Sequence, residues 1–180
     1  IIFETVNMTF KMKKIISSLL SLAMLLTITS GLNLTAYADV QTGSCGDNVT
    51  YSLDTSTGVL TISGTGDMAD YSVSDNSPFH DNASIKSVVI ESGVTSIGEW
   101  AFDYCKSLTS VTIPDSVTSI GYAAFKNCES LTSVTIPDSV TSIGYLAFSG
   151  CISLTSITIP DSVTSIDEWA FSFCSSLTGV

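Results

Sequence analysis

The chain has 180 residues, and its 17 Asp and Glu against six Lys and Arg give a formal net charge of −11 at pH 7. So acidic a chain repels phosphate backbones and has no basic stripe, which excludes a nucleic-acid-binding protein and electrostatic docking to an anionic membrane. The length is ample for one domain with its own hydrophobic core.

The first part of the chain contains a predicted secretion signal. Two lysines follow Met12, a mainly apolar run covers 15–26, and a small-x-small cleavage pattern ends at Ala38. The apolar run is too short to span a bilayer comfortably, so we predict a cleaved signal over 12–38 rather than a membrane anchor, with 1–11 as upstream sequence. Cleavage leaves three lysines against 16 acidic residues, a net charge of −13, in a secreted or cell-surface chain without membrane insertion.

Residues 39–66 are predicted to form an N-terminal β-hairpin cap. Apolar and polar side chains alternate over 50–53 and 59–62, as in half-buried strands, and 54–58 form a turn pattern. Such a hairpin covers the apolar residues and strand edges that the first coil of a repeat domain exposes. The following stretch, 67–89, is predicted to be a degenerate first repeat, because its apolar residues precede those of the next repeat by one period.

Four copies of a 23-residue repeat occupy 90–180 and begin at Ile90, Ile113, Ile136 and Ile159. Several columns are apolar in every copy, namely those that start at Val94, Ile97, Ala101, Phe102, Leu108 and Val111. A fixed period of 20 to 29 residues with apolar side chains in register is the signature of a leucine-rich solenoid. Each coil of a solenoid buries its apolar face against the next copy.

Within each coil, Leu-Thr-Ser-Val-Thr-Ile is the predicted strand, and it ends before Pro114, Pro137 or Pro160, because proline cannot donate to a strand ladder. The Ala-Phe segment is too short for a full helix and predicts one 3₁₀ or α turn. The predicted fold class is therefore an α/β-type solenoid. It is a leucine-rich repeat with a short parallel β-sheet on the concave face, short helical turns on the convex side and the hairpin cap.

The sequence stops at Val180, inside a repeat and on a predicted strand residue. Solenoids need a polar terminal cap for solubility, and none follows here. We therefore expect a fragment of a longer protein; the alternative is a true terminus whose last coil a partner covers.

The repeats resemble a known family. Their consensus is Ile-Pro-Asp-Ser-Val-Thr-Ser-Ile-Gly-x-x-Ala-Phe-x-x-Cys-x-Ser-Leu-Thr-Ser-Val-Thr, which closely resembles the BspA-like leucine-rich repeat. Residues 43–68 resemble the leader before such repeats, so the resemblance covers 43–180. It implies a bacterial surface or secreted protein, in some cases an adhesin for host proteins such as fibronectin and fibrinogen or for other bacteria, with no shared catalytic residues. Departures at 91–93 and Asp167 leave the local turn geometry open.

One cysteine recurs in each repeat: Cys105, Cys128, Cys151 and Cys174. Metal sites usually need close pairs such as Cys-x-x-Cys, and this sequence has none. Neighbouring coils could bring two thiols near disulfide distance, but side chains of one column point the same way rather than at each other. We therefore predict buried thiols that fill a small slot in the core. Cys45 is either a free thiol or a residue buried under the cap.

Two further kinds of residue could carry chemistry. Asp115, Asp138 and Asp161 recur in the turn after the strand, where stacked carboxylates could hold Ca²⁺. The alternative, which we favour, is that Asp suits the turn by accepting hydrogen bonds from nearby backbone N–H groups. His80 is the single histidine, and no nucleophile elbow accompanies it, so we predict a surface or cap-packing role. No metal or cofactor and no enzymatic activity are predicted.

Side chains that alternate with the buried strand residues point outward and would line the concave sheet with small hydroxyls. They are Ser110, Thr112, Ser133, Thr135, Ser156 and Thr158. Solenoids use such extended surfaces for binding, so these six are the predicted binding site for an extracellular protein. The alternative is that Ser and Thr only keep a parallel sheet wettable. The predicted function is adhesion or protein binding; the alternatives are a spacer that presents another domain, or an enzyme whose catalytic domain lies elsewhere.

Opposite charges also recur one coil apart, at Asp103 with Lys126 and at Lys106 with Glu129. We expect these pairs to help set the register of the coils. Exposed ion pairs contribute only ~0–1 kcal/mol, so Lys126→Glu is expected to cost little stability.

Overall fold

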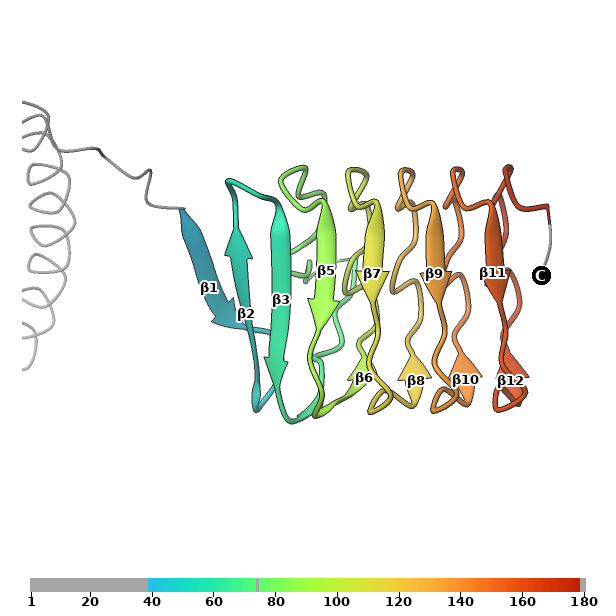
Figure 1. Ribbon diagram of the computed structural model, residues 1–180, viewed down its shortest axis with the longest axis horizontal. Coiled ribbons are helices and arrows are strands. Elements are labelled where there is room, and N and C mark those ends of the chain that lie inside the picture. The colour runs from blue at the N-terminus through green and yellow to red at the C-terminus, as the bar shows by residue number, and fades with distance from the viewer. Residues whose placement is uncertain (1–38, 74, 179–180) are drawn as a thin grey trace, which may run out of the picture. The chain divides into compact units, whose positions relative to one another are not determined.

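The computed structural model describes residues 39–73 and 75–178, which form twelve strands in two sheets (Figure 1). The predicted signal at 12–38, the upstream residues 1–11 and the predicted strand residue Val180 lie outside this range. The described residues form one compact unit.

Three antiparallel strands begin the unit: β1 (Val40–Ser44), β2 (Val49–Asp54) and β3 (Val59–Gly64). β2 and β3 are the two strands of the expected hairpin. Their turn is closed by the Asp54 carboxylate, which accepts hydrogen bonds from the backbone N–H groups of Ser56 (2.9 Å) and Thr57 (3.3 Å). Gly58 completes it with a φ of 79°, a left-handed conformation that favours glycine. β1 was not predicted, because its exposed sequence Val-Gln-Thr-Gly-Ser has no apolar alternation.

The seven-stranded sheet joins this hairpin to the repeats in the order β1-β2-β3-β5-β7-β9-β11. Its parallel strands are β5 (Ser87–Ile90), β7 (Ser110–Thr112), β9 (Ser133–Thr135) and β11 (Ser156–Thr158). Each strand pairs with the one a repeat later, so equivalent residues become neighbours. Figure 1 shows these strands side by side along one face of the stacked coils. The strand and its position in the repeat were predicted correctly, but in the regular repeats it covers only three of the six predicted residues and ends before the isoleucine that precedes proline.

A second parallel sheet was not predicted. Its five strands are β4 (Gly66–Asp67), β6 (Val94–Ile97), β8 (Ser119–Ile120), β10 (Ser142–Ile143) and β12 (Ser165–Ile166). The signal for it was the Val-Thr-Ser-Ile alternation in each repeat, which is only four residues long. So short a segment becomes a strand because the neighbouring coil supplies its hydrogen bonds.

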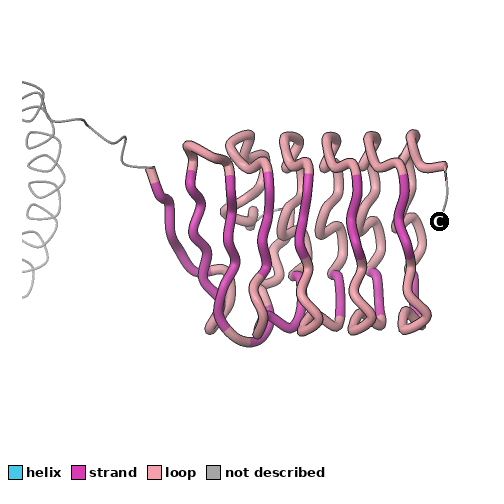
Figure 2. The backbone as a smooth tube through the Cα atoms, viewed as in Figure 1, coloured by secondary structure: helices cyan, strands magenta, loops and turns pink. Residues whose placement is uncertain are grey.

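The predicted helical turns on the convex side are wrong. No helix occurs in 39–73 or 75–178, and Figure 2 shows turns and loops between the two sheets. Trp100 and Tyr104 have φ values of 56° and 60°, which a right-handed helix does not allow. The amides between them alternate in direction: Asp103 N–H donates back to Trp100 O (3.4 Å), whereas Phe102 N–H donates to Ala124 O of the next coil (2.8 Å). Stacking thus replaces the repeated hydrogen bonds of a helix.

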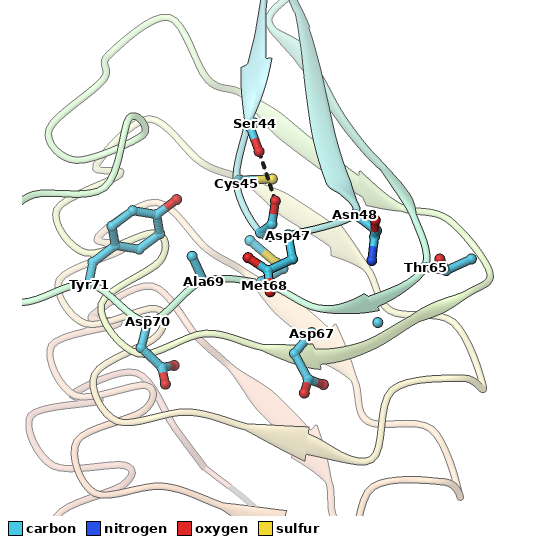
Figure 3. A pocket seen from close by; sticks show the side chains of 12 residues that line it. Ser44, Cys45, Asp47, Asn48, Thr65, Asp67, Met68, Ala69, Asp70 and Tyr71 are labelled. Carbon is cyan, nitrogen blue, oxygen red and sulfur yellow. Dashed lines mark hydrogen bonds between the residues drawn. The ribbon is translucent and has the colours of Figure 1, made fainter.

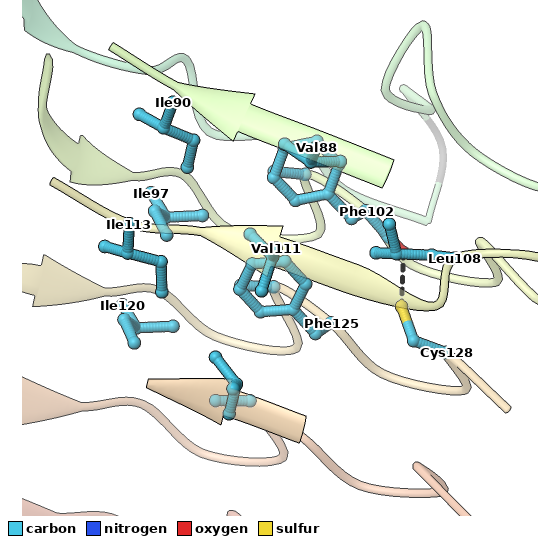
Figure 4. Close-up of a cluster of buried hydrophobic side chains, with 14 of the residues drawn as sticks. Val88, Ile90, Ile97, Phe102, Leu108, Val111, Ile113, Ile120, Phe125 and Cys128 are labelled. Atoms are coloured by element: carbon cyan, nitrogen blue, oxygen red, sulfur yellow. Dashed lines mark hydrogen bonds between the residues drawn. The ribbon is translucent and has the colours of Figure 1, made fainter. Parts of the chain in front are cut away.

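The predicted apolar columns form the core between the two sheets (Figure 4). One phenylalanine of each coil stacks on the next at ring-centre distances of 5.1–5.5 Å, in the column Phe79, Phe102, Phe125, Phe148 and Phe171. Burial in these columns falls in the last coil: Ile143 is 1% exposed and Ile166, its equivalent, is 46% exposed.

Candidate functional site

The six predicted binding residues all lie on the outward face of the seven-stranded sheet. They are exposed, whereas Val111, Val134 and Ile157 between them are buried. Strand register places Ser133 between Ser110 and Ser156, so the serines form one row and the threonines of the same strands form a second. We call this surface the hydroxyl face. Its predicted orientation is correct; its binding role stays a prediction.

A neighbouring row of threonines has hydroxyls that form hydrogen bonds to the backbone of the preceding coil. Thr109, Thr132 and Thr155 each donate their side-chain hydroxyl to the carbonyl oxygen one coil earlier, at 2.9, 3.4 and 3.3 Å. Within the described part of the chain, the hydroxyls of the six hydroxyl-face residues have no such partner. They are therefore left to solvent or to a ligand.

The turn after each strand of this sheet carries an exposed aspartate: Asp115, Asp138 and Asp161. The expected hydrogen bonds from the turn's backbone to these aspartates are not found among the described residues, and the serine after the first two aspartates binds the coil before it instead. Ser116 donates to Val94 O at 2.7 Å and accepts from Gly93 N at 3.2 Å, and Ser139 donates to Val117 O at 2.6 Å. The described residues contain no group of three or more His, Cys, Asp or Glu side chains placed to hold a metal ion.

The cysteine column consists of buried free thiols, as predicted. Cys105, Cys128 and Cys151 are fully buried, and Cys174 is half-buried. Each Sγ donates to the carbonyl oxygen of the phenylalanine in the coil before it, for example Cys128 to Phe102 O at 3.2 Å (Figure 4). Burial raises the pKa of Cys105 to about 12 and that of Cys128 well above its usual range. Cys45, the open case, is a buried free thiol.

The expected ion pairs are half right. Lys106 Nζ lies 2.9 Å from Glu129 Oε1, on the surface. Asp103 is wrongly predicted to be exposed: it is 3% exposed, and its Oδ2 lies 3.4 Å from His80 Nδ1. Lys126 instead places its ammonium 4.8 Å from the centre of the Trp100 ring. His80 thus packs against the first full repeat.

Burial raises the pKa of Asp103 to about 6, although the charges of Lys126 and His80 oppose that shift. One of its carboxylate oxygens, Oδ1, is buried without a hydrogen-bond partner in the described structure. A buried carboxylate with one unpaired oxygen costs free energy when it is ionised, so the ionised form of Asp103 lowers stability.

A polar pocket of about 640 Å³ lies where the hairpin meets the degenerate repeat (Figure 3), and no sequence signal indicated it. Asp47, Asp67, Asp70 and Tyr71 help to line it. A hydrogen bond from the Thr95 hydroxyl (2.6 Å) fixes the Asp67 carboxylate and lowers its pKa. The Asp70 carboxylate likewise accepts from the backbone N–H of Glu99 (2.9 Å).

A second hollow, about 510 Å³ in volume, is lined by Ser72, Val73, Glu99, Trp100 and Tyr122. We call it the aromatic groove. It lies in the turns that follow β6 and β8, away from the hydroxyl face. In the part of the chain that the structure describes, no helix has the length and hydropathy to cross a membrane.

Comparison with known proteins gives the relatives of this chain. Three solved structures are similar: a leucine-rich repeat protein of Treponema pallidum, TpLRR (28% identity, TM-score 0.59), one from Eubacterium ventriosum (32%, 0.59) and a leucine-rich cell surface protein from Faecalibacterium prausnitzii (31%, 0.62). The matches cover 71%, 77% and 75% of this chain but only 65%, 42% and 38% of those proteins. No curated protein matches the chain.

The family description "BspA type Leucine rich repeat region" matches residues 73–180 in six copies. This range contains the part of the degenerate repeat from Val73 onward and all four regular repeats. Among the similar structures, the Faecalibacterium prausnitzii protein is described as a cell surface protein. The stacked coils, the repeat consensus and this match agree, and the chain belongs to the BspA-type leucine-rich repeat family.

Proposed function

We propose that the chain is a secreted or cell-surface binding module that attaches to an extracellular protein through the hydroxyl face. The observation that carries this proposal is the array of outward hydroxyls on β7, β9 and β11, which lack partners in the described structure. The strands repeat at ~4.8 Å, so the array presents donors and acceptors at regular intervals on a rigid sheet. Extended surfaces of this kind are the usual binding surfaces of solenoids.

Small hydroxyls suit a protein partner because they allow a close approach and form hydrogen bonds with little loss of side-chain entropy. The relative that is described as a cell surface protein supports an extracellular setting, as does the predicted signal peptide. A bacterium that displays such a module could attach to host proteins or to other cells.

The test is binding of the purified chain to immobilised fibronectin, fibrinogen and a panel of polysaccharides. The matched variant carries two bulky charges on the face, Ser133→Arg and Thr135→Arg. Saturable binding to a protein that is weakened by this variant would support adhesion through the hydroxyl face.

Absence of binding by well-folded protein would favour the alternative, a spacer that presents another domain. That alternative has some support, because the matched part is less than half of two longer relatives. Selective binding to a polysaccharide would replace the protein partner with a glycan.

A further inference from the structure

The aromatic groove has a wall of aromatic rings held in a fixed arrangement. The Trp100 and Tyr122 ring centres are 5.1 Å apart at an angle of 48°, and Tyr145 stacks on Tyr122 at 5.5 Å and 13°. The backbone N–H of Trp100 also donates to the backbone carbonyl of Tyr122 at 2.8 Å, which joins the two coils that carry the rings. The arrangement of the aromatic rings is therefore preformed in the protein without a ligand.

The groove also contains a carboxylate whose backbone is anchored. Glu99 N–H donates to the Asp70 carboxylate (2.9 Å), and Glu99 O accepts from Tyr71 N–H (3.0 Å). Its side chain is exposed and lies in no ion pair of the described structure. An unpaired carboxylate beside aromatic rings is the combination that recognises cations, through charge and through the negative faces of the rings.

One ring of the wall, that of Trp100, already contacts an ammonium group of the protein itself. Lys126 Nζ lies 4.8 Å from the centre of the Trp100 ring. After residue 38 the chain has three lysines and 16 acidic residues, so its negative net charge attracts cations from solution.

We propose that the aromatic groove is a second binding site, which takes an arginine or lysine side chain from a basic extracellular polypeptide. The guanidinium or ammonium group lies between the Glu99 carboxylate and the ring wall of Trp100 and Tyr122. This site is separate from the hydroxyl face and does not depend on the function proposed for it.

The test uses the fluorescence of Trp100. The chain has two tryptophans, and Trp169→Phe removes the exposed one in the last coil, so the remaining signal comes from the groove. The full chain with this change is titrated with a hexa-arginine peptide at low salt. We expect a saturable change in fluorescence that weakens as sodium chloride is added.

Two charge variants in this background separate the groove from general attraction to an acidic protein. Glu99→Gln removes the groove carboxylate, and Glu168→Gln removes the equivalent exposed carboxylate three coils later. We expect the first to raise the dissociation constant about five- to tenfold and the second less than twofold. Tyr122→Leu is expected to raise it by a few fold, and circular dichroism checks that each variant is folded.

Three results would overturn the proposal. Equal loss in both glutamate variants would mean that only net charge attracts the peptide. A fluorescence response to neutral oligosaccharides but not to hexa-arginine would make the groove a glycan site. Unchanged fluorescence throughout the titration would mean that the groove binds no cation.

Discussion

At the scale of single residues, Asp103 is the side chain whose environment differs most from what its type predicts. Its column also contains His80, Lys126 and Ser149, so the sequence marks this position as polar and favours an exposed site. The fold buries it because the turns before and after it pack against the neighbouring coils. The local sequence does not predict burial of a polar residue of this kind. Burial of the apolar columns can be predicted, because every repeat has an apolar residue at those positions.

Asp103→Asn is expected to stabilise the protein at pH 7. Burial raises the pKa of Asp103 from 3.8 to about 6, so the folded state holds a proton more tightly than the unfolded state does. The cost of the charge is full above pH 6 and is relieved as the pH falls from about 6 to about 4. At about 1.4 kcal/mol for each pKa unit, the gain in unfolding free energy at pH 7 is at most about 3 kcal/mol, because the Asn amide keeps an unpaired polar atom in place of Oδ1.

Urea denaturation of both proteins at pH 7 and at pH 4.5 measures this difference. The advantage of the Asn variant should shrink at the lower pH. A variant that is less stable at pH 7 would mean that the contacts of Asp103 with His80 and Lys126 outweigh its burial.

Lys126→Glu is expected to cost on the order of 2 kcal/mol, more than the sequence suggested. The change removes the ammonium from the face of Trp100 and brings a carboxylate near buried Asp103. Lys106→Ala is the control, because its pair with Glu129 is exposed and worth at most about 1 kcal/mol. Similar denaturation midpoints for the two variants would show that the Lys126 position is as tolerant as the exposed one.

At the scale of elements, the sequence predicted the strand that recurs in each coil, but it did not predict the structure that depends on hydrogen bonds between coils. The strand at β7, β9 and β11 follows from alternation and from the proline after it. The five-stranded sheet and the left-handed residues such as Trp100 depend on hydrogen bonds to the next coil, which no local pattern shows. Local propensity favoured a helical turn there, and contacts between coils overrode it.

The cysteine column allows a test of coil packing in solution. We expect Cys128 to be unreactive toward a thiol reagent at pH 8 in the folded protein, because burial raises its pKa and encloses its sulfur. Cys174, half-buried in the last coil, should react first. Mass spectrometry of the labelled peptides at successive times checks the order, and urea should make all five thiols react. Rapid labelling of Cys128 without urea would contradict the packing.

At the scale of the whole molecule, the repeat establishes the stacked architecture, and position in the stack determines how much each copy contributes. Ile143 and Ile166 occupy the same column, yet the first is enclosed between two coils and the second is half exposed. Stability in a solenoid is a sum over coils and the contacts between neighbours, so identical residues need not be equivalent.

Ile143→Ala is therefore expected to lower the unfolding free energy by about 2–5 kcal/mol, as for other buried isoleucines. Ile166→Ala should lower it by less than half of that, because its side chain is already partly in water. Chemical denaturation of the two variants gives the comparison, and equal losses would mean that the last coil is as well covered as the one before it.

The two candidate binding surfaces also differ in how far the sequence predicts them. The outward positions of the hydroxyl face follow from strand alternation alone and were predicted residue by residue. The aromatic groove brings Val73 of the degenerate repeat beside Trp100 and Tyr122 of two later coils. Three segments more than 20 residues apart meet there, and only the stacked structure reveals that they do.

The most direct test of the central proposal is an affinity ratio for whichever extracellular protein the chain binds. The dissociation constant is measured for Ser133→Arg with Thr135→Arg, and for a control with the same two charges at exposed serines outside the strands, Ser92→Arg with Ser176→Arg. We predict at least a tenfold loss for the first pair and less than twofold for the control. Equal affinities would contradict a binding site on the hydroxyl face.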